Sequence, residues 1–131
     1  MAIKLLLAED DLQLVDMYSR KFELEGFEVQ VAEDGRKALN ILAEGYCPDV
    51  AILDVMMPEV DGLEVLRTIK EDEKYKDLIV IMLTNLSDDH TAERIYALGA
   101  TEYIVKAEMT PLEVANKVKE LVHIYKEKAK N

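Results

Sequence analysis

The chain has 131 residues, the length of one ordinary domain that can bury a core without disulfides or a structural metal. Hydrophobic residues make up 50% of it, charged residues make up 33%, and the formal net charge of −11 opposes direct binding to nucleic acid or to an anionic membrane surface. The single cysteine, Cys47, excludes an internal disulfide, and the N-terminal apolar run is too short for a signal peptide or a membrane span, so we expect a cytoplasmic protein.

Five short segments of the chain predict five strands. They are Ile3 to Ala8, Phe27 to Ala32, Val50 to Leu53, Leu78 to Leu83 and Glu102 to Val105. The continuous apolar runs of the first, third and fourth segments are typical of strands that are buried on both faces. Polar and apolar residues alternate in the second segment, which is typical of an edge strand.

A segment with helical periodicity follows each predicted strand. The first of these helices is predicted to end at Gly26, a residue suited to a left-handed cap, and the second runs from about Gly35 to Glu44. The third begins after Asp61, with Glu64 reaching back in a capping box. The fourth begins near Asp88 with Ser87 as its cap.

The fifth helix begins at a capping box from Thr110 to Glu113, with Pro111 in its first turn. Apolar residues at helical spacing predict an inward stripe on the first and last helices. These residues are Leu12, Val15, Tyr18 and Phe22 on the first helix, and Leu112, Ala115, Val118, Leu121 and Tyr125 on the last.

Buried strands that alternate with helices are typical of a parallel sheet that helices cover on both faces, with right-handed crossovers. We therefore predict a single α/β domain with its core at about residues 3–125. In open sheets of this kind, ligands bind beyond the carboxyl ends of the strands. A functional site is expected at that edge of the sheet.

Polar residues follow four of the five predicted strands. Glu9 and Asp10 follow the first strand, Asp54 follows the third, Thr84 follows the fourth and Lys106 follows the fifth. Because the carboxyl ends of parallel strands share one edge, these side chains are expected to lie close together. If the first and third strands are neighbours, about 4.8 Å apart, Asp10 and Asp54 repel each other unless a cation lies between them.

Oxygen ligands without histidine or cysteine select a hard cation, above all Mg²⁺. With a hydroxyl and an ammonium group nearby, such a site suits transfer of a phosphoryl group onto a carboxylate. Asp54 would attack the phosphorus, Lys106 would pair with one phosphoryl oxygen, and Thr84 would donate a hydrogen bond to another. The product would be an acyl phosphate.

One set of residues resembles the motifs of response regulator receiver domains of two-component signalling: Glu9-Asp10, Asp54 followed by Met56, Met57 and Pro58, Gly62, Thr84 and Lys106. The resemblance covers nearly the whole chain. It implies a flavodoxin-like three-layer sandwich with five helices and a five-stranded parallel sheet in the order 2-1-3-4-5. It also implies a single receiver domain over residues 1–131, of stand-alone type unless the chain is a piece of a longer regulator.

The same resemblance implies the ligands of the site. Asp54 would be phosphorylated by a sensor histidine kinase or a histidine phosphotransfer protein. Mg²⁺ would be bound by Asp10, Asp54 and the backbone carbonyl of Met56, with Glu9 acting through water. The protein would be a phosphoacceptor that assists its own phosphorylation and dephosphorylation, and not an enzyme.

The resemblance further implies a switch. Thr84 would move toward the phosphoryl group, and Tyr103 would rotate with it. The surface formed by the fourth helix, the fifth strand and the fifth helix would then bind a downstream protein target, or a second copy of the chain in a phosphorylation-dependent homodimer.

Two positions depart from the usual receiver pattern. Ala107 follows Lys106, where receiver domains usually have a proline joined by a cis peptide that aims the lysine. A cis bond to alanine costs about 3 to 4 kcal/mol, so either its surroundings hold it or a trans loop aims Lys106. Asn85 stands where the family often has a small residue, and it either narrows access to Asp54 or offers a phosphoryl oxygen another donor.

Two other functions fit parts of the same pattern. A Mg²⁺-dependent phosphatase with an aspartyl nucleophile, as in the haloacid dehalogenase family, needs a second acid two residues after the nucleophile, where this chain has Met56. A non-phosphorylated interaction scaffold of receiver shape would have no need for the acids at the strand ends. The sequence therefore favours the phosphorylated switch.

Overall fold

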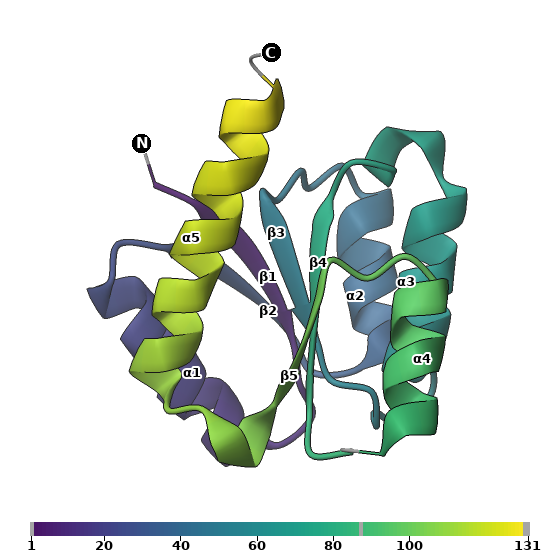
Figure 1. Ribbon diagram of the computed structural model, residues 1–131, viewed down its shortest axis with the longest axis horizontal. Coiled ribbons are helices and arrows are strands. Elements are labelled where there is room, and N and C mark those ends of the chain that lie inside the picture. Colours follow the sequence, from purple (N-terminus) through teal and green to yellow (C-terminus); the bar gives the residue numbers. More distant parts are fainter. Residues whose placement is uncertain (1, 87, 130–131) are drawn as a thin grey trace.

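Three layers make up the computed structural model, which describes residues 2–86 and 88–129 (Figure 1). Its middle layer is one sheet of five parallel strands in the order β2-β1-β3-β4-β5. The strands are β1 (Lys4–Ala8), β2 (Glu28–Ala32), β3 (Val50–Leu53), β4 (Ile79–Thr84) and β5 (Glu102–Val105). The predicted fold class and strand order are confirmed, and β2 lies at an edge as its alternating sequence predicts.

Helices form the two outer layers. They are α1 (Leu12–Leu24), α2 (Gly35–Ala43), α3 (Gly62–Glu71), α4 (Asp89–Ala97) and α5 (Pro111–Ala129), with short 3₁₀ turns η1 (Glu73–Tyr75) and η2 (Lys106–Glu108). Figure 1 shows α1 and α5 on one face of the sheet and α2, α3 and α4 on the other. Within the described ranges, no helix combines the length and the apolar sequence that crossing a membrane requires.

Each face of the sheet carries its own apolar core. Leu5 and Leu7 of β1 pack with residues of α1 and α5, while Leu6 packs with residues of α2, α3 and α4. This alternation is the period of two expected along a strand. Every residue of β3 and β4 is buried, so the central strands are covered on both faces, as their apolar sequences predict.

The ends of α1 and α5 are more exposed than helical spacing predicts. Leu12 is 66% exposed, Leu112 is 43% exposed and Tyr125 is 40% exposed. Leu12 and Leu112 lie in the first turns of their helices, and Tyr125 lies toward the end of α5, which extends past the sheet (Figure 1). An apolar stripe on a helix is buried only where the sheet lies beneath it. The prediction that the stripe residues face the core is therefore wrong for these three residues, and it is confirmed for Tyr18 and Phe22.

Side-chain caps fix where the helices begin, and two of these caps test the sequence predictions. At α5, Thr110 and Glu113 each donate a backbone N–H to the other's side chain, at 2.9 and 3.2 Å, so the predicted capping box is confirmed. At α3, the Asp61 carboxylate accepts the Glu64 N–H at 2.9 Å. The Glu64 carboxylate does not reach back as predicted, because it pairs with Arg67 one turn farther along the helix.

The start of α4 and the end of α1 are also fixed locally. Asp88 caps α4 by accepting the Thr91 N–H at 2.8 Å, one residue later than predicted. Ser87, the predicted cap, lies outside the described residues. Gly26 follows α1 with a φ of 92°, so its predicted left-handed conformation is confirmed.

An ion pair joins the two helices on the α1–α5 face and predicts a dependence of stability on pH. Lys119 donates to the Glu25 carboxylate at 2.7 Å, and this hydrogen bond, helped by the lysine charge, lowers the pKa of Glu25 below its usual 4.5. A lowered carboxylate pKa stabilises the fold above pH 4.5, and this stabilisation is lost as the pH falls through the lowered pKa. We expect Lys119→Met to melt slightly below the wild type at pH 7 in thermal scans, and this difference in melting temperature to shrink as the pH falls below 4.5.

The control for this variant is Lys128→Met, which removes a lysine from the exposed end of the same helix. The difference in melting temperature between Lys128→Met and the wild type should be the same at high and at low pH. A constant difference for Lys119→Met would contradict the assigned role of the pair.

Candidate functional site

The carboxyl ends of four strands place polar residues at one edge of the sheet. Ala8 of β1 pairs with Leu53 of β3, so Glu9 and Asp54 are the next residues on neighbouring strands. The Asp54 N–H donates to the Ala8 carbonyl at 3.0 Å, which continues the ladder up to the acidic residue. Thr84 pairs with Val105 in the same way at the ends of β4 and β5. Parallel register therefore fixes the level at which each polar side chain leaves the sheet.

Three carboxylates converge at this edge. Glu9, Asp10 and Asp54 each offer an oxygen within 4.8 Å of the others. Glu9 is 2% exposed and Asp54 is 7% exposed, whereas Asp10 lies at the surface. Burying carboxylates is costly unless a cation compensates them. The expected convergence of Asp10 and Asp54 is observed, and a positive charge is needed to offset the repulsion between the carboxylates.

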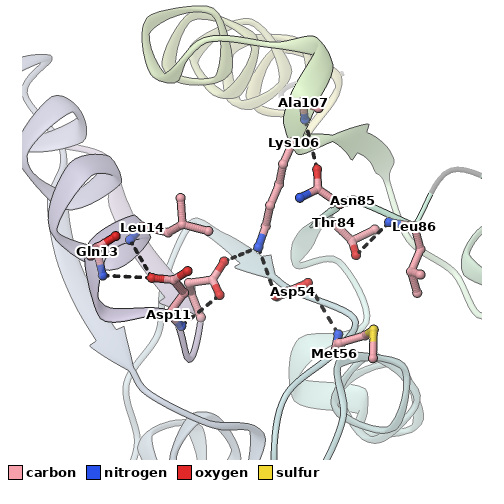
Figure 2. Close-up of polar contacts among 11 residues, drawn as sticks. Asp11, Gln13, Leu14, Asp54, Met56, Thr84, Asn85, Leu86, Lys106 and Ala107 are labelled. Atoms are coloured by element: carbon pink, nitrogen blue, oxygen red, sulfur yellow. Dashed lines mark hydrogen bonds and ion pairs between the residues drawn. The ribbon is translucent and has the colours of Figure 1, made fainter.

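Lys106 supplies part of that charge. Its side chain is 10% exposed, and its ammonium donates to Asp54 Oδ2 at 3.0 Å (Figure 2). It also donates to Glu9 Oε1. Burial raises the pKa of Glu9, and the hydrogen bond from Lys106 only partly opposes this rise. Burial lowers the pKa of Lys106, but the bonds to the two carboxylates outweigh it and raise that pKa overall. Lys106 therefore stays charged between the two acids.

The loop that carries Lys106 is held by a contact that the sequence did not reveal. The Lys106–Ala107 peptide is trans, which settles the two alternatives left open by the alanine. The Ala107 N–H donates to Asn85 Oδ1 at 3.1 Å (Figure 2). The two departures from the receiver pattern thus touch each other. Residues 22 positions apart on two loops give no sequence signal of contact until the register of β4 and β5 is known.

The loop after β4 is tied to β5 by a second contact. The Thr84 hydroxyl, which is buried, accepts the Leu86 N–H at 3.3 Å. The Tyr103 hydroxyl donates to the Leu86 carbonyl. Tyr103 is half-buried and packs against the core on the α2–α4 face. Thr84 and Tyr103, the two predicted switch residues, are therefore both hydrogen-bonded to the backbone of Leu86.

The loop after β3 forms the open side of the site. The Met56 N–H lies 3.4 Å from Asp54 Oδ1, and its side chain is 64% exposed. Asp10, Asp61 and residues 55–58 line a hollow of about 490 Å³ there. Glu59 has a φ of 68°, an uncommon conformation for glutamate that the sequence did not indicate.

Gly62 fixes how closely this loop and α3 approach the strand. A Cβ atom at Gly62 would lie 2.0 Å from the backbone carbonyl oxygen of Asp54. The Gly62 N–H donates to the Val55 carbonyl at 2.8 Å, so the start of α3 is bonded directly behind the acid. Sequence reasoning marked Gly62 as part of a motif but missed this steric reason for it.

The donor set fits a hard divalent cation. Counted at their formal charges, three carboxylates and one ammonium sum to −2, which a divalent ion would neutralise. Asp10 faces the open side, while both Glu9 oxygens already accept hydrogen bonds, one from Lys106 and one from the Asp11 N–H at 3.1 Å. The exposed Asp10 is therefore better placed than Glu9 to ligate an ion directly.

The fold and the site together define a parallel α/β domain with an acidic pocket and a lysine at its carboxyl edge. A family model of the response regulator receiver domain matches residues 5–119. The chain therefore belongs to the receiver domain family of two-component response regulators, as its motifs predict.

Two curated relatives are similar over most of this chain. Response regulator MprA of Mycolicibacterium vanbaalenii is 37% identical over 108 residues, which are 81% of this chain and 45% of that protein. The transcriptional regulatory protein CpxR homolog of Haemophilus influenzae is 41% identical over 103 residues, 79% of this chain and 43% of that protein. The chain thus spans less than half the length of these relatives.

Solved structures share the fold. A CheY-like receiver domain protein from Methanospirillum hungatei JF-1 has a TM-score of 0.89 at 23% identity, covering 98% of this chain and 99% of that one. That likeness shows the fold alone. Chemotaxis response regulator CheY4 of Vibrio cholerae has a TM-score of 0.83 at 32% identity, covering 93% of this chain and 99% of that one.

Proposed function

We propose that the chain is a phosphorylation switch in which Asp54 accepts a phosphoryl group from a phosphohistidine of a sensor histidine kinase or a histidine phosphotransfer protein. The observation that carries the proposal is the position of Asp54. Its carboxylate is buried at the end of a central strand, lies within 4.8 Å of two other acids and is held 3.0 Å from the Lys106 ammonium. Such an arrangement can bind and stabilise a group with several negative oxygens.

The transfer exchanges one bond to phosphorus for another. An Asp54 carboxylate oxygen donates an electron pair to phosphorus and forms an O–P bond, while the P–N bond of the phosphohistidine breaks. The phosphohistidine ring carries a proton on its other nitrogen, so the bonding pair returns to the ring and the imidazole leaves neutral with that proton. Lys106 pairs with a phosphoryl oxygen, since its ammonium already lies beside Asp54 Oδ2. The product is an acyl phosphate.

We further propose Mg²⁺ as the cofactor, held by Asp10, Asp54 and the Met56 backbone carbonyl, with Glu9 acting through water. The oxygen-only donor set and the residual charge at the site support this assignment. The ion would neutralise charge on the phosphoryl group as it is transferred. Glu9 keeps its hydrogen bonds to Lys106 and to the Asp11 N–H in this arrangement, which fixes the start of the loop that carries Asp10.

Phosphorylation is proposed to reach the surface through the loop after β4. The Thr84 hydroxyl accepts the Leu86 N–H and still has its own O–H to donate, so a phosphoryl oxygen that draws this hydroxyl toward Asp54 would pull Leu86 and its loop along with it. Leu86 is also the residue whose carbonyl holds the Tyr103 hydroxyl. A shift of the loop therefore frees Tyr103 and changes the α4–β5–α5 surface, where a downstream target or a second copy of the chain would bind.

We propose that the chain does not turn over small phosphate esters. A phosphatase with an aspartyl nucleophile needs a general acid two residues after the nucleophile. Met56 stands at that position, and its side chain is apolar and points into solvent. The chain thus suits a protein that keeps its phosphoryl group until water or a partner removes it.

The experiment that tests this function is incubation with phosphoramidate and MgCl₂, followed by intact mass measurement. The wild type should gain one phosphoryl group, and Asp54→Asn should gain none. Asp16→Asn, which changes an exposed aspartate on α1, should behave as the wild type. A phosphorylated Asp54→Asn would place the acceptor elsewhere, and a wild type without any adduct would favour a non-phosphorylated scaffold.

Binding of Mg²⁺ makes a separate prediction about stability. A ligand at about 100 times its Kd stabilises the folded state by about 2.7 kcal/mol, so MgCl₂ should raise the melting temperature of the wild type and excess chelator should reverse the rise. Asp10→Asn should lose this response because it removes a ligand. In chelator alone, Asp10→Asn should melt above the wild type, because one of three mutually repelling carboxylates is gone. Equal responses of both proteins to MgCl₂ would contradict the assigned site.

A further inference from the structure

We infer that Asn85 is a positioning residue for Lys106, and that its side-chain amide aims the lysine by holding the Ala107 N–H. The inference rests on the proposed phosphorylation of Asp54 and adds a residue that acts through the lysine. Asn85 Oδ1 accepts the Ala107 N–H at 3.1 Å, one peptide beyond the lysine whose ammonium contacts Asp54.

Strand register explains why these two loops meet. Thr84 and Val105 are partners at the ends of β4 and β5, so Asn85 and Lys106 leave neighbouring strands at the same level. Figure 2 shows the Asn85 side chain between the two loops, with its oxygen directed at Ala107. The hydrogen bond therefore bridges the loop that carries Thr84 and the turn that carries Lys106.

Lys106 needs such a support because it has to reach across a strand. It follows β5, whereas Asp54 follows β3, and β4 lies between them. Strands are spaced about 4.8 Å apart, so roughly 10 Å separates β5 from β3, and the lysine side chain, the Asp54 side chain and the hydrogen bond between them together cover that distance. A small tilt at the base of this long side chain displaces the ammonium, and a misplacement of about 1 Å in a reacting group can cost much of the rate.

Among the described residues, few other side chains hold the turn from which Lys106 projects, and Met109, which packs against the α1–α5 core, comes only after it. The turn is η2, and its preceding residue, Val105, makes no side-chain cap. Ala107 and Glu108 are exposed, so packing does not fix the outer side of the turn. Within the described residues, the bond from Asn85 thus ties this backbone to the loop after β4.

The same bond fixes the orientation of the Asn85 amide. A backbone N–H can be matched only by the amide oxygen, so the NH₂ group of Asn85 points away from Ala107. Asn85 itself is exposed at the rim of the pocket. A role through Lys106 and a direct contact with the phosphoryl group are therefore separable, because only the first depends on the lysine.

The first test is a double-mutant cycle on phosphorylation by phosphoramidate with MgCl₂. Asn85→Ala should slow the reaction about three- to tenfold, the loss expected when one neutral hydrogen bond is removed. In a Lys106→Met background, the same substitution should have no further effect, because the residue it positions is absent. An equal loss in both backgrounds would overturn the inference and would favour direct contact with the phosphoryl group or general damage to the fold.

The second test does not depend on phosphorylation. Hydrogen exchange by NMR should show a protected Ala107 amide in the wild type, an unprotected one in Asn85→Ala, and protection again in Asn85→Asp, which keeps an acceptor oxygen. Acylation of Lys106 by acetic anhydride, mapped by mass spectrometry, should rise in Asn85→Ala relative to that of Lys117. Unchanged protection and labelling would overturn the inference.

Asn116→Ala is the matched control, since it removes an exposed asparagine from α5 away from the site. It should leave the rate, the Ala107 protection and the labelling of Lys106 unchanged. The two tests also separate the two levels of the argument. If the wild type took up no phosphoryl group, the proposed function would be wrong. If the Ala107 amide were nevertheless protected in the wild type and unprotected in Asn85→Ala, the contact between Asn85 and Ala107 would still be supported.

Discussion

Lys106→Met is expected to be phosphorylated on Asp54 by phosphoramidate about 100-fold more slowly than the wild type. The lysine ammonium lies 3.0 Å from the Asp54 carboxylate and is itself nearly buried, so it is in place before the phosphoryl group arrives. Removing one preorganised donor to a developing negative charge costs about 100- to 1000-fold in rate, and the lower value applies here because one side of the pocket is open. Methionine keeps most of the length and apolar stem of lysine. The time course of the mass gain measures the effect.

Lys117→Met is the matched control for this prediction. Lys117 lies on α5 and pairs with Glu102 at 3.6 Å, so the same chemical change is made away from the pocket. It should be phosphorylated at the wild-type rate. If Lys106→Met also kept that rate, Lys106 would have no part in neutralising the phosphoryl group.

Gly62→Ala is expected to lower the free energy of unfolding by about 3 kcal/mol, at the upper end of the cost of overpacking. A methyl group there would lie 2.0 Å from the Asp54 carbonyl oxygen and 2.9 Å from the Val55 Cα. Both are backbone atoms that cannot rotate away, so β3 and α3 would have to separate. Phosphorylation should also slow, because Asp54 moves with its backbone. Urea denaturation measures the loss of stability.

Gly45→Ala separates this clash from the ordinary cost of replacing glycine. Gly45 has a φ of 106° and nothing within 4 Å of an added Cβ, so its substitution strains only the local backbone. That strain should cost about 1 kcal/mol. A loss for Gly62→Ala no larger than that for Gly45→Ala would show that the loop after β3 can yield, and that the close approach is not a constraint on Asp54.

The sheet and the positions of the acids could be predicted because both depend on local sequence and on parallel geometry. The run from Val50 to Leu53 has no polar alternation, so it predicts a strand buried on both faces, and Asp54 then has to lie at its end. Parallel strands end at one edge, which is sufficient to bring Asp10 toward Asp54. Lys106 could be placed in the same way, although its bond to Glu9 could not.

The contacts between loops could not be predicted because they depend on register and backbone shape. Nothing in the sequence pairs Asn85 with Ala107, and both were singled out only as separate departures from a family pattern. The need for glycine at position 62 follows from the path of the Asp54 backbone, which no periodicity encodes. The exposure of Leu12 has the same origin, since a helical stripe does not reveal where the sheet beneath it stops.

Because Lys106 is bound to two anionic side chains at rest, phosphorylation of Asp54 would exchange one counter-charge of the lysine for another. Its ammonium would have an anionic neighbour both before and after the transfer. The resting and phosphorylated forms would then differ in which oxygen accepts the hydrogen bond of the Lys106 ammonium. Neither phosphorylation nor dephosphorylation would leave this buried charge without a partner, so the desolvation cost would be small both ways. Asp54 could therefore be phosphorylated and dephosphorylated repeatedly without an unpaired lysine charge in the protein interior.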